Sequence, residues 1–250
     1  MPTKRVIPSL LLRNGRLVKG TRFAEYRDAG NPVTTARAHN AQGADELLLV
    51  DIDASPQGRA LQADVIRDVA AECFMPLAVG GGIRTVDDAH RCMDAGADKL
   101  AINTGALDRP GVIDELARIF GSQAVIVSID FSDGENPNVI DFRTNKPHSA
   151  KPELEVWIAE AIDRGCGEIR LMAHDREGTK AGFPTTVIEK LRDIPVPLIV
   201  EGGIGSFEQA SEAFLAGADA IGLGTMLVFE DNNIVKVKRA LAALGHEMRK

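Results

Sequence analysis

The chain of 250 residues has few cysteines, and they form no recognisable set. Cys73, Cys92 and Cys166 are scattered along the sequence, which argues against a disulfide framework and leaves no metal-ligand spacing. The first residues run directly into an apolar strand and lack the apolar core of a secretory signal. We therefore expect reduced, structural thiols in a cytoplasmic protein, with no metal and no redox cofactor.

The chain also lacks an excess of positive charge and any long apolar run. Its formal net charge is -7, which argues against a nucleic-acid or anionic-membrane surface. No apolar stretch approaches the roughly 18 residues of a membrane-spanning helix. The 44% hydrophobic content is enough for a full core, and no linker divides the chain. We expect one domain over residues 1–250.

Short β-branched or leucine-rich runs alternate with amphipathic segments along the whole sequence. The expected strands are residues 5–12, 46–52, 76–80, 98–103, 123–130, 168–173, 197–201 and 219–224. The expected helices are residues 34–42, 57–72, 85–95, 110–119, 154–164, 185–192, 206–216 and 232–243. Eight buried strands alternating with eight helices predict an α/β fold, a single (β/α)8 TIM barrel. In such a barrel the strand C-termini and the loops after them build the active site.

The sequence contains a repeat of about half its length. From Pro76 to Ala106, 12 of 31 positions are identical to those 121 residues later. This period is too long for a solenoid unit and predicts two repeated half-barrels, of about residues 1–122 and 123–250. The opening strands of the halves also align, at an offset of 119 residues. There Leu11 in the first half corresponds to Asp130 in the second.

Each repeat carries a glycine cluster after one strand and a threonine after the next strand. Glycines let a backbone approach an anion closely, and N–H groups at a helix N-terminus donate to it. We expect each glycine cluster to open a helix and to form a phosphate cup. The alternative is that the glycines only make tight turns. Two cups across one barrel mouth predict a ligand with a phosphate at each end. The cup residues would be Gly81, Gly82, Asn103 and Thr104 in the first half, and Gly202, Gly203, Gly224 and Thr225 in the second.

Two connections are longer than the usual ones, and they occupy matching positions in the two halves. Residues 13–32 follow the first strand, and residues 131–152 follow the fifth. The second connection has a possible hairpin around Val139–Thr144. Long loops on the catalytic face are typical of lids, which we expect for the first connection, whereas for the second a lid and an ordinary loop both stay open.

Several of these segments together resemble one family. The sequence resembles the cyclase subunit (HisF family) of imidazole glycerol phosphate synthase from residue 4 to about residue 230. The segments that carry the resemblance are residues 4–8, 14–20, 79–83, 101–104, 120–125 and 175–179. A sister isomerase of histidine synthesis shares the repeat and the cups, but residues 18–20 and 121–124 look like the cyclase.

The resemblance implies a glutamine-dependent synthase of histidine biosynthesis, a lyase. A HisH-type glutaminase would form a heterodimer with this chain and release ammonia, which would travel through the barrel. At the mouth, ammonia would meet a bisphosphorylated aminoimidazole-carboxamide ribonucleotide. That substrate would be split and cyclised to imidazole glycerol phosphate and AICAR, with carboxylates at the ends of strands 1 and 5 as acid and base.

The resemblance also assigns roles to individual residues. Asp130 matches the strand-5 carboxylate, whereas the strand-1 carboxylate falls at Leu11. Lys19 would hold a phosphate or order the lid, and Glu177 would belong to the substrate site. Further departures from the family pattern are Ser9, Met172 and Glu177 itself, which replaces an aspartate. Asp51 and His174 are candidates to replace the missing carboxylate, or else Asp51 orders the mouth and His174 is a loop residue.

Charged residues stand at the N-terminal ends of four expected strands: Arg5, Glu46, Lys99 and Glu168. Two of each sign can form a ring of ion pairs. This ring could be a structural plug. In the resembled family the matching residues form the gate through which ammonia enters, and Asp98 matches a residue at the glutaminase interface.

Two other functions stay open beside the synthase reaction. The loss of the carboxylate at Leu11 fits a divergent paralogue that channels ammonia to an amidotransferase. That enzyme would modify a nucleotide sugar for surface polysaccharide such as lipopolysaccharide. The third possibility is a scaffold that only docks and activates the glutaminase, against which the intact cups and lid argue.

Overall fold

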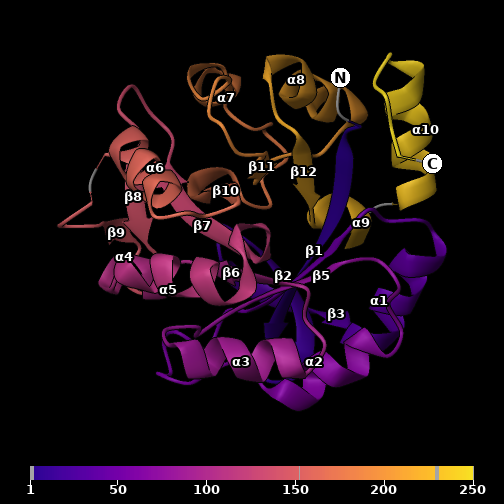
Figure 1. Ribbon diagram of the computed structural model, residues 1–250. Coiled ribbons are helices and arrows are strands. Elements are labelled where there is room, and N and C mark those ends of the chain that lie inside the picture. Colours follow the sequence, from indigo (N-terminus) through magenta and orange to yellow (C-terminus); the bar gives the residue numbers. More distant parts are fainter. Residues whose placement is uncertain (1–2, 152, 229–230, 250) are drawn as a thin grey trace.

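The computed structural model describes residues 3–151, 153–228 and 231–249. Within these residues eight parallel strands close into a barrel, with helices around the outside (Figure 1). In chain order the barrel strands are β1 (Arg5–Arg13), β4 (Leu47–Asp51), β5 (Leu77–Gly80), β6 (Lys99–Ile102), β7 (Val125–Ser132), β10 (Glu168–Ala173), β11 (Leu198–Glu201) and β12 (Ala220–Leu223). The β1–β12 and β7–β10 pairings complete the closure. The predicted TIM barrel is confirmed.

The helices follow the strands as expected, with differences at their starts. They are α1 (Pro32–Ala41), α2 (Ala63–Ala70), α3 (Val86–Asp94), α4 (Thr104–Asp108), α5 (Gly111–Phe120), α6 (Leu154–Asp163), α7 (Thr185–Lys190), α8 (Phe207–Ala216), α9 (Thr225–Val228) and α10 (Ile234–Ala243). The expected helix over residues 57–72 begins only at Ala63. Gly58 has a left-handed φ of 65°, and the chain makes turns before it. No helix in the described part of the chain is long and apolar enough to cross a membrane.

The side chains of the strands alternate between two apolar cores. Outward positions pack against the helices and form the large core. Inward positions of seven strands form a separate layer inside the barrel, consisting of Ile7, Leu48, Ala78, Ala101, Ile126, Ile199 and Ala220. This alternation is the period of two that a strand imposes on its side chains. On β1 the inward series therefore runs from Arg5 through Ile7 and Ser9 to Leu11.

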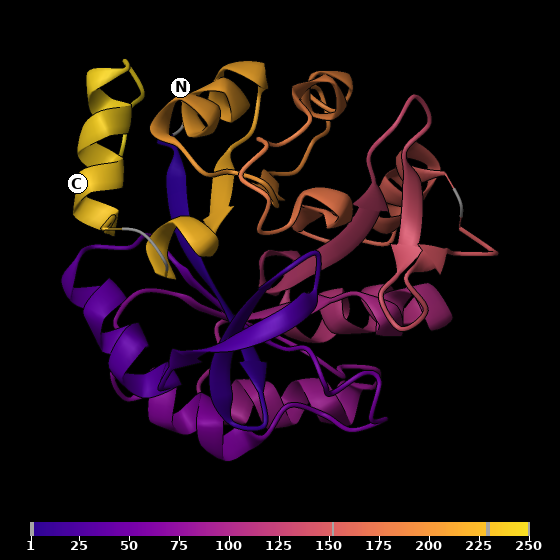
Figure 2. The ribbon, with the colours of Figure 1, turned by 180° about the vertical axis from the view of Figure 1, so that it is seen from behind.

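Both long connections form antiparallel hairpins. The first consists of β2 (Arg16–Thr21) and β3 (Ala24–Gly30), and β2 also pairs with the end of β1. The second consists of β8 (Asn138–Asp141) and β9 (Lys146–Pro147), with β8 paired to the end of β7. In Figure 2 the first hairpin lies in front of the barrel strands. The first connection was expected as a loop, so its regular pairing is a difference; the hairpin expected in the second is present.

Candidate active site

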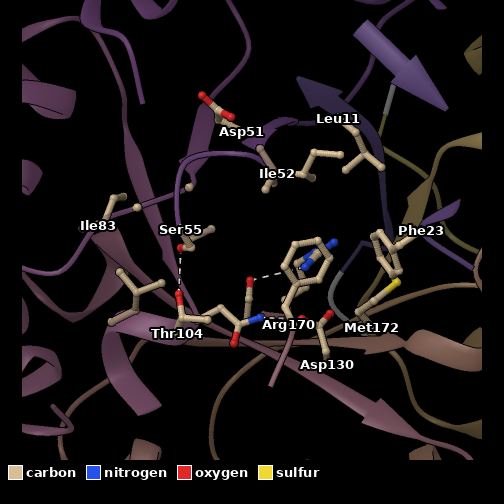
Figure 3. A pocket seen from close by; sticks show the side chains of 18 residues that line it. Leu11, Phe23, Asp51, Ile52, Ser55, Ile83, Thr104, Asp130, Arg170 and Met172 are labelled. Atoms are coloured by element: carbon tan, nitrogen blue, oxygen red, sulfur yellow. Dashed lines mark hydrogen bonds between the residues drawn. The ribbon is translucent and has the colours of Figure 1, made fainter. Parts of the chain in front are cut away.

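A cavity with about 650 Å³ of empty space opens at the C-terminal ends of the barrel strands. Leu11, Asp130, Arg170 and Met172 surround it together with Phe23 from the first hairpin (Figure 3). The cavity is therefore built by strands of both sequence repeats. This is the end of a barrel at which the loops and strand termini assemble catalytic groups.

Asp130 is buried in this cavity, on the inward face of β7. The Asn103 side-chain amide donates a hydrogen bond of 2.6 Å to its Oδ2. Burial raises the pKa of the Asp130 carboxyl above its usual range, while Arg170, His174 and the Asn103 hydrogen bond act against that rise. A carboxyl group with a raised pKa exchanges protons at a pH closer to neutral, as a general acid or base must.

Leu11 lines the same cavity from β1 and is only 4% exposed. In the sheet it lies between Val50 of β4 and Val18 of β2. Leu11 and both of its neighbours in the sheet are therefore apolar. The first repeat places no carboxylate where the second repeat places Asp130.

The two residues considered as replacements for a strand-1 carboxylate, Asp51 and His174, have different surroundings in the structure. Asp51 is held by Arg59, with distances of 2.5 and 3.2 Å from the two Nη atoms, and it also accepts from the Asp53 amide. His174 is buried in stacked contact with Phe23, with ring centroids 4.8 Å apart. Its Nδ1 makes no hydrogen bond within the described residues. Asp51 is thus already committed to an ion pair, whereas His174 is available but shielded.

The residues of the first expected cup line the large cavity. Gly82 has a left-handed φ of 68°, and a Cβ there would lie 1.9 Å from the Arg59 carbonyl oxygen, so only glycine fits. Thr104 begins α4, and its hydroxyl lies 2.8 Å from that of Ser55. Gly81 and Asn103 complete the group, although the Asn103 amide faces Asp130.

The second expected cup surrounds a smaller cavity with about 240 Å³ of empty space. Its lining includes Gly202, Gly203, Gly224, Thr225 and Glu177. The Thr225 hydroxyl is buried without a hydrogen-bond partner in the described structure. A buried hydroxyl of this kind is free to bind a ligand oxygen.

The expectation that each glycine cluster opens a helix is wrong. Helix α3 begins at Val86 and is capped by Thr85, whose side chain forms a capping box with Asp88. Helix α8 begins at Phe207 and is capped by Ser206. Because these side chains already satisfy the helix N-termini, the glycines form the preceding loops, and the short helices α4 and α9 begin at the cup threonines.

Lys19 connects the first hairpin to the second cup. It is 2% exposed, forms an ion pair with Glu177, and packs against Gly224, where a Cβ would lie 2.4 Å from its Nζ. The Arg22 amide also donates to the Glu177 carbonyl oxygen at 2.8 Å. Lys19 thus fixes the hairpin of the first repeat against the cup of the second.

The four charged residues at the opposite end of the barrel form a closed ring. Arg5 contacts Glu46 at 3.0 Å and Glu168 at 2.7 Å, and Lys99 contacts the same two carboxylates at 2.6 Å each. Arg5 and Lys99 thus bridge both acids, as the sequence predicted. The inner apolar layer lies between this ring and the cavity.

Asp98 lies exposed on the same end of the barrel as the ring. Its carboxylate accepts a hydrogen bond of 2.8 Å from the Leu77 amide, so it borders the segment that leads into β5. Phe74, three residues before Leu77, is 92% exposed. The sequence reasoning did not single out this phenylalanine, because a phenylalanine is usually buried in a core and the sequence does not show that this one is exposed.

Sequence reasoning also missed a buried ion pair beside Asp130. Arg170 on β10 contacts Glu201 at the end of β11, with an Nη2–Oε2 distance of 2.6 Å. The available signal was the alternation along β10. Glu168, Arg170 and Met172 occupy inward positions of a barrel strand, where a second charge is unexpected.

The described residues contain no group of histidine, cysteine and carboxylate side chains that could hold a metal ion. Cys73, Cys92 and Cys166 are free thiols.

Comparison with known proteins gives full-length matches. The family described as histidine biosynthesis protein matches residues 5–233. The chain is 41% identical over 248 residues to the imidazole glycerol phosphate synthase subunit HisF of Wolinella succinogenes, covering 98% of each chain. It is 42% identical to proteins of the same name from Campylobacter concisus, over 246 residues, and Micrococcus luteus, over 251 residues, again with 98% coverage of each chain.

Proposed function

The chain belongs to the histidine biosynthesis protein family, and on that premise we propose that it is the cyclase-type subunit of an imidazole glycerol phosphate synthase. Its activity is then that of a lyase. It uses ammonia to convert a bisphosphorylated aminoimidazole-carboxamide ribonucleotide into imidazole glycerol phosphate and AICAR. The observation that carries this proposal is the buried Asp130 in one of two glycine-lined cavities at one barrel mouth.

The geometry supports a division of labour in the mouth. The first cup, at Gly82 and Thr104, and the second cup, at Gly203 and Thr225, would each hold one phosphate of the substrate. Asp130 would then face the middle of the ligand and transfer protons as the amine adds and the leaving group departs. Asn103 orients the carboxylate through its 2.6 Å hydrogen bond.

The ring at the other end supports an ammonia route. Ammonia from a HisH-type glutaminase subunit would enter at Arg5, Glu46, Lys99 and Glu168 and cross the inner apolar layer to the cavity. Exposed Asp98 would belong to the surface that binds the glutaminase. The free thiols and the absence of a membrane-spanning helix in the described residues are compatible with the cytoplasm, where we place this complex.

The test is turnover of the bisphosphorylated precursor by the purified chain with excess ammonium salt at alkaline pH. Ammonium replaces the glutaminase, so the assay isolates the chemistry of the barrel. We expect turnover in the wild-type protein and a loss of about 10²–10⁴-fold in Asp130→Asn, because that change removes the proton-transferring group.

Leu11→Asp is the matched variant, because it restores a carboxylate at the equivalent position of the first repeat. If the wild-type protein is inactive and Leu11→Asp is active, the proposed reaction is wrong for this chain. The barrel would then deliver ammonia to another enzyme, as in the alternative with a nucleotide sugar. The names of the relatives give that alternative no support.

A further inference from the structure

The barrel interior holds an ion pair that the proposed reaction does not yet use. Arg170 donates to Glu201 Oε2 from Nε at 3.0 Å and from Nη2 at 2.6 Å. The two side chains are only 7% and 2% exposed. Taking two charges out of water costs several kcal/mol per ion before their attraction compensates, so a buried pair is weak evidence for stability alone. This pair therefore needs an explanation in its surroundings.

The sheet order places three charged residues on three consecutive strands. Asp130 is on β7, Arg170 on the adjacent strand β10, and Glu201 on the next strand, β11. In register, Arg170 pairs with Ser128, which occupies the inward position before Asp130, and its Nη1 lies 3.4 Å from the Ser128 hydroxyl. Arg170 and Asp130 line the same cavity, as Figure 3 shows. Met172, not Arg170, is in register with both Asp130 and Glu201, so the Arg170 cation lies one inward position before the two carboxylates, and its ion pair is with Glu201.

The fold makes room for this arrangement. A Cβ on Gly222 of β12 would lie 2.7 Å from Glu201 Oε2, so a larger residue there would displace the carboxylate. The second oxygen, Oε1, is buried without a partner among the described residues. Glu201 therefore depends on Arg170 for its compensation, and Arg170 is held on the cavity side by Ser128.

We propose that Arg170 is a positioning residue that favours the ionised form of Asp130 against the effect of burial, and that Glu201 is the counter-ion that limits this effect so that Asp130 can still take up a proton. The inference rests on the proposed function only in taking Asp130 as the proton-transferring group. It explains how one carboxylate can work in a mouth where Leu11 and Met172 are apolar neighbours that favour its neutral form.

The other groups that face Asp130 do not replace this pair. From β6 the Asn103 amide donates a hydrogen bond, and His174 follows β10. From β4, Asp51 lines the same cavity but is already paired with Arg59 at 2.5 Å. Burial raises the pKa of Asp130, Arg170 and His174 lower it, and Glu201 raises it. The pair thus places one basic and one acidic side chain near Asp130.

The experiment compares Glu201→Gln and Arg170→Met by titrating the Asp130 side chain with ¹³C NMR on aspartate-labelled protein, assigned with Asp130→Asn. In Glu201→Gln the charge of Arg170 is unopposed, so we expect the pKa of Asp130 to fall by about one pH unit. In Arg170→Met a carboxylate faces a carboxylate, so we expect the pKa to rise by a similar amount or more. A contact that is merely structural would not shift the two variants in opposite directions.

Two further variants guard against loss of folding in Arg170→Met. Arg170→Lys keeps the charge and should leave the Asp130 titration close to that of the wild-type protein. Arg170→Met combined with Glu201→Met replaces the pair by apolar side chains, which buried pairs often tolerate, and should raise the pKa of Asp130. Asp45→Asn is the control, because Asp45 is buried and the change breaks its ion pair with the half-buried Lys238, at 2.7 Å, on the ring side of the barrel.

Turnover with ammonium separates this inference from the proposed function. We expect the acid limb of the pH–kcat profile to move with the NMR titration in each variant, at little change in KM. An Asp130 titration that is unchanged or shifts the same way in both variants overturns the inference, whether or not the enzyme is active. If the pKa of Asp130 moves in opposite directions in the two variants but the protein shows no turnover, the effect of Arg170 and Glu201 on Asp130 is supported and the synthase reaction is rejected.

Discussion

At the scale of single residues, two glutamates of the same ion-pair ring have pKa values that are shifted in opposite directions. Burial raises the pKa of the Glu46 carboxyl, whereas Arg5 and Lys99 hold the pKa of Glu168 below its usual range against the effect of burial. Both acids belong to one ring and touch the same two cations. Sequence position predicted the ring, but the different surroundings of its members depend on distances that only the folded chain supplies.

The cysteines give a prediction at this scale. Burial raises the pKa of Cys73 and Cys92 to about 11 and that of Cys166 to about 12. Because the thiolate is the reactive form, we expect all three to react slowly with a thiol reagent at pH 8 and faster as the pH approaches 11. Colorimetric thiol titration of native and denatured protein measures this. Rapid reaction of Cys73, the half-buried one, in native protein at pH 8 would contradict the expectation.

At the scale of elements, the two hairpins meet above the cavity. Phe23, in the turn of the first hairpin, stacks on His174 and makes an edge contact with Phe142, which follows β8, with centroids 5.2 Å apart. Phe23 and Phe142 both line the cavity. The hairpins of the two repeats therefore share one aromatic cluster, which holds the first hairpin in place over the mouth.

Removing that cluster should loosen the hairpin. Aromatic pairs contribute about 0.5–1.5 kcal/mol each beyond the area they bury. We expect Phe23→Ala to raise the KM for the bisphosphorylated precursor by about tenfold, measured by steady-state kinetics with ammonium. Arg16→Ala is the control on the same hairpin, because it removes only the exposed ion pair with Asp28. Equal KM values for Phe23→Ala and Arg16→Ala would count against a closing role of the cluster.

The elements also show how far the sequence could be interpreted. The strand over residues 168–173 was predicted with its observed bounds although it contains Glu168 and Arg170, because strands that alternate with helices are typical of a parallel barrel. The hairpin in residues 13–32 could not be predicted, because β3 is polar and mostly exposed and the position of β2 depends on contact with β1 and Glu177. The Arg170–Glu201 pair was missed for a similar reason, since its partners are 31 residues apart.

At the scale of the whole molecule, the two ends of the barrel differ in character. The mouth carries glycine loops and hairpins, and the opposite end carries the ring with exposed Asp98 and Phe74 nearby. A phenylalanine that is 92% exposed buries almost none of its surface in the isolated chain. Aromatic residues are enriched at the energetic centres of protein interfaces. This end is where a glutaminase would bind if ammonia enters through the ring.

Phe74 provides a test of that assignment. We expect Phe74→Ala to weaken binding of the glutaminase subunit by about 30-fold or more, the loss of a residue worth about 2 kcal/mol, in a calorimetric titration. Turnover with ammonium should be unchanged, because Phe74 is remote from the cavity. Val156→Ala is the control, since Val156 is 59% exposed on α6, outside the ring end. A normal Kd in Phe74→Ala would place the partner elsewhere.

The contact between Lys19 and Glu177 has a consequence for the history of the repeat. The lysine comes from the first repeat and the glutamate from the second, and both are nearly excluded from water. Two copies of residues 1–122 would bury one Lys19 without its glutamate at each of two equivalent seams, and two copies of residues 123–250 would bury one Glu177 without its lysine at each. Each half has thus become the specific complement of the other. We therefore expect a symmetric dimer of either half to be less stable than the intact chain.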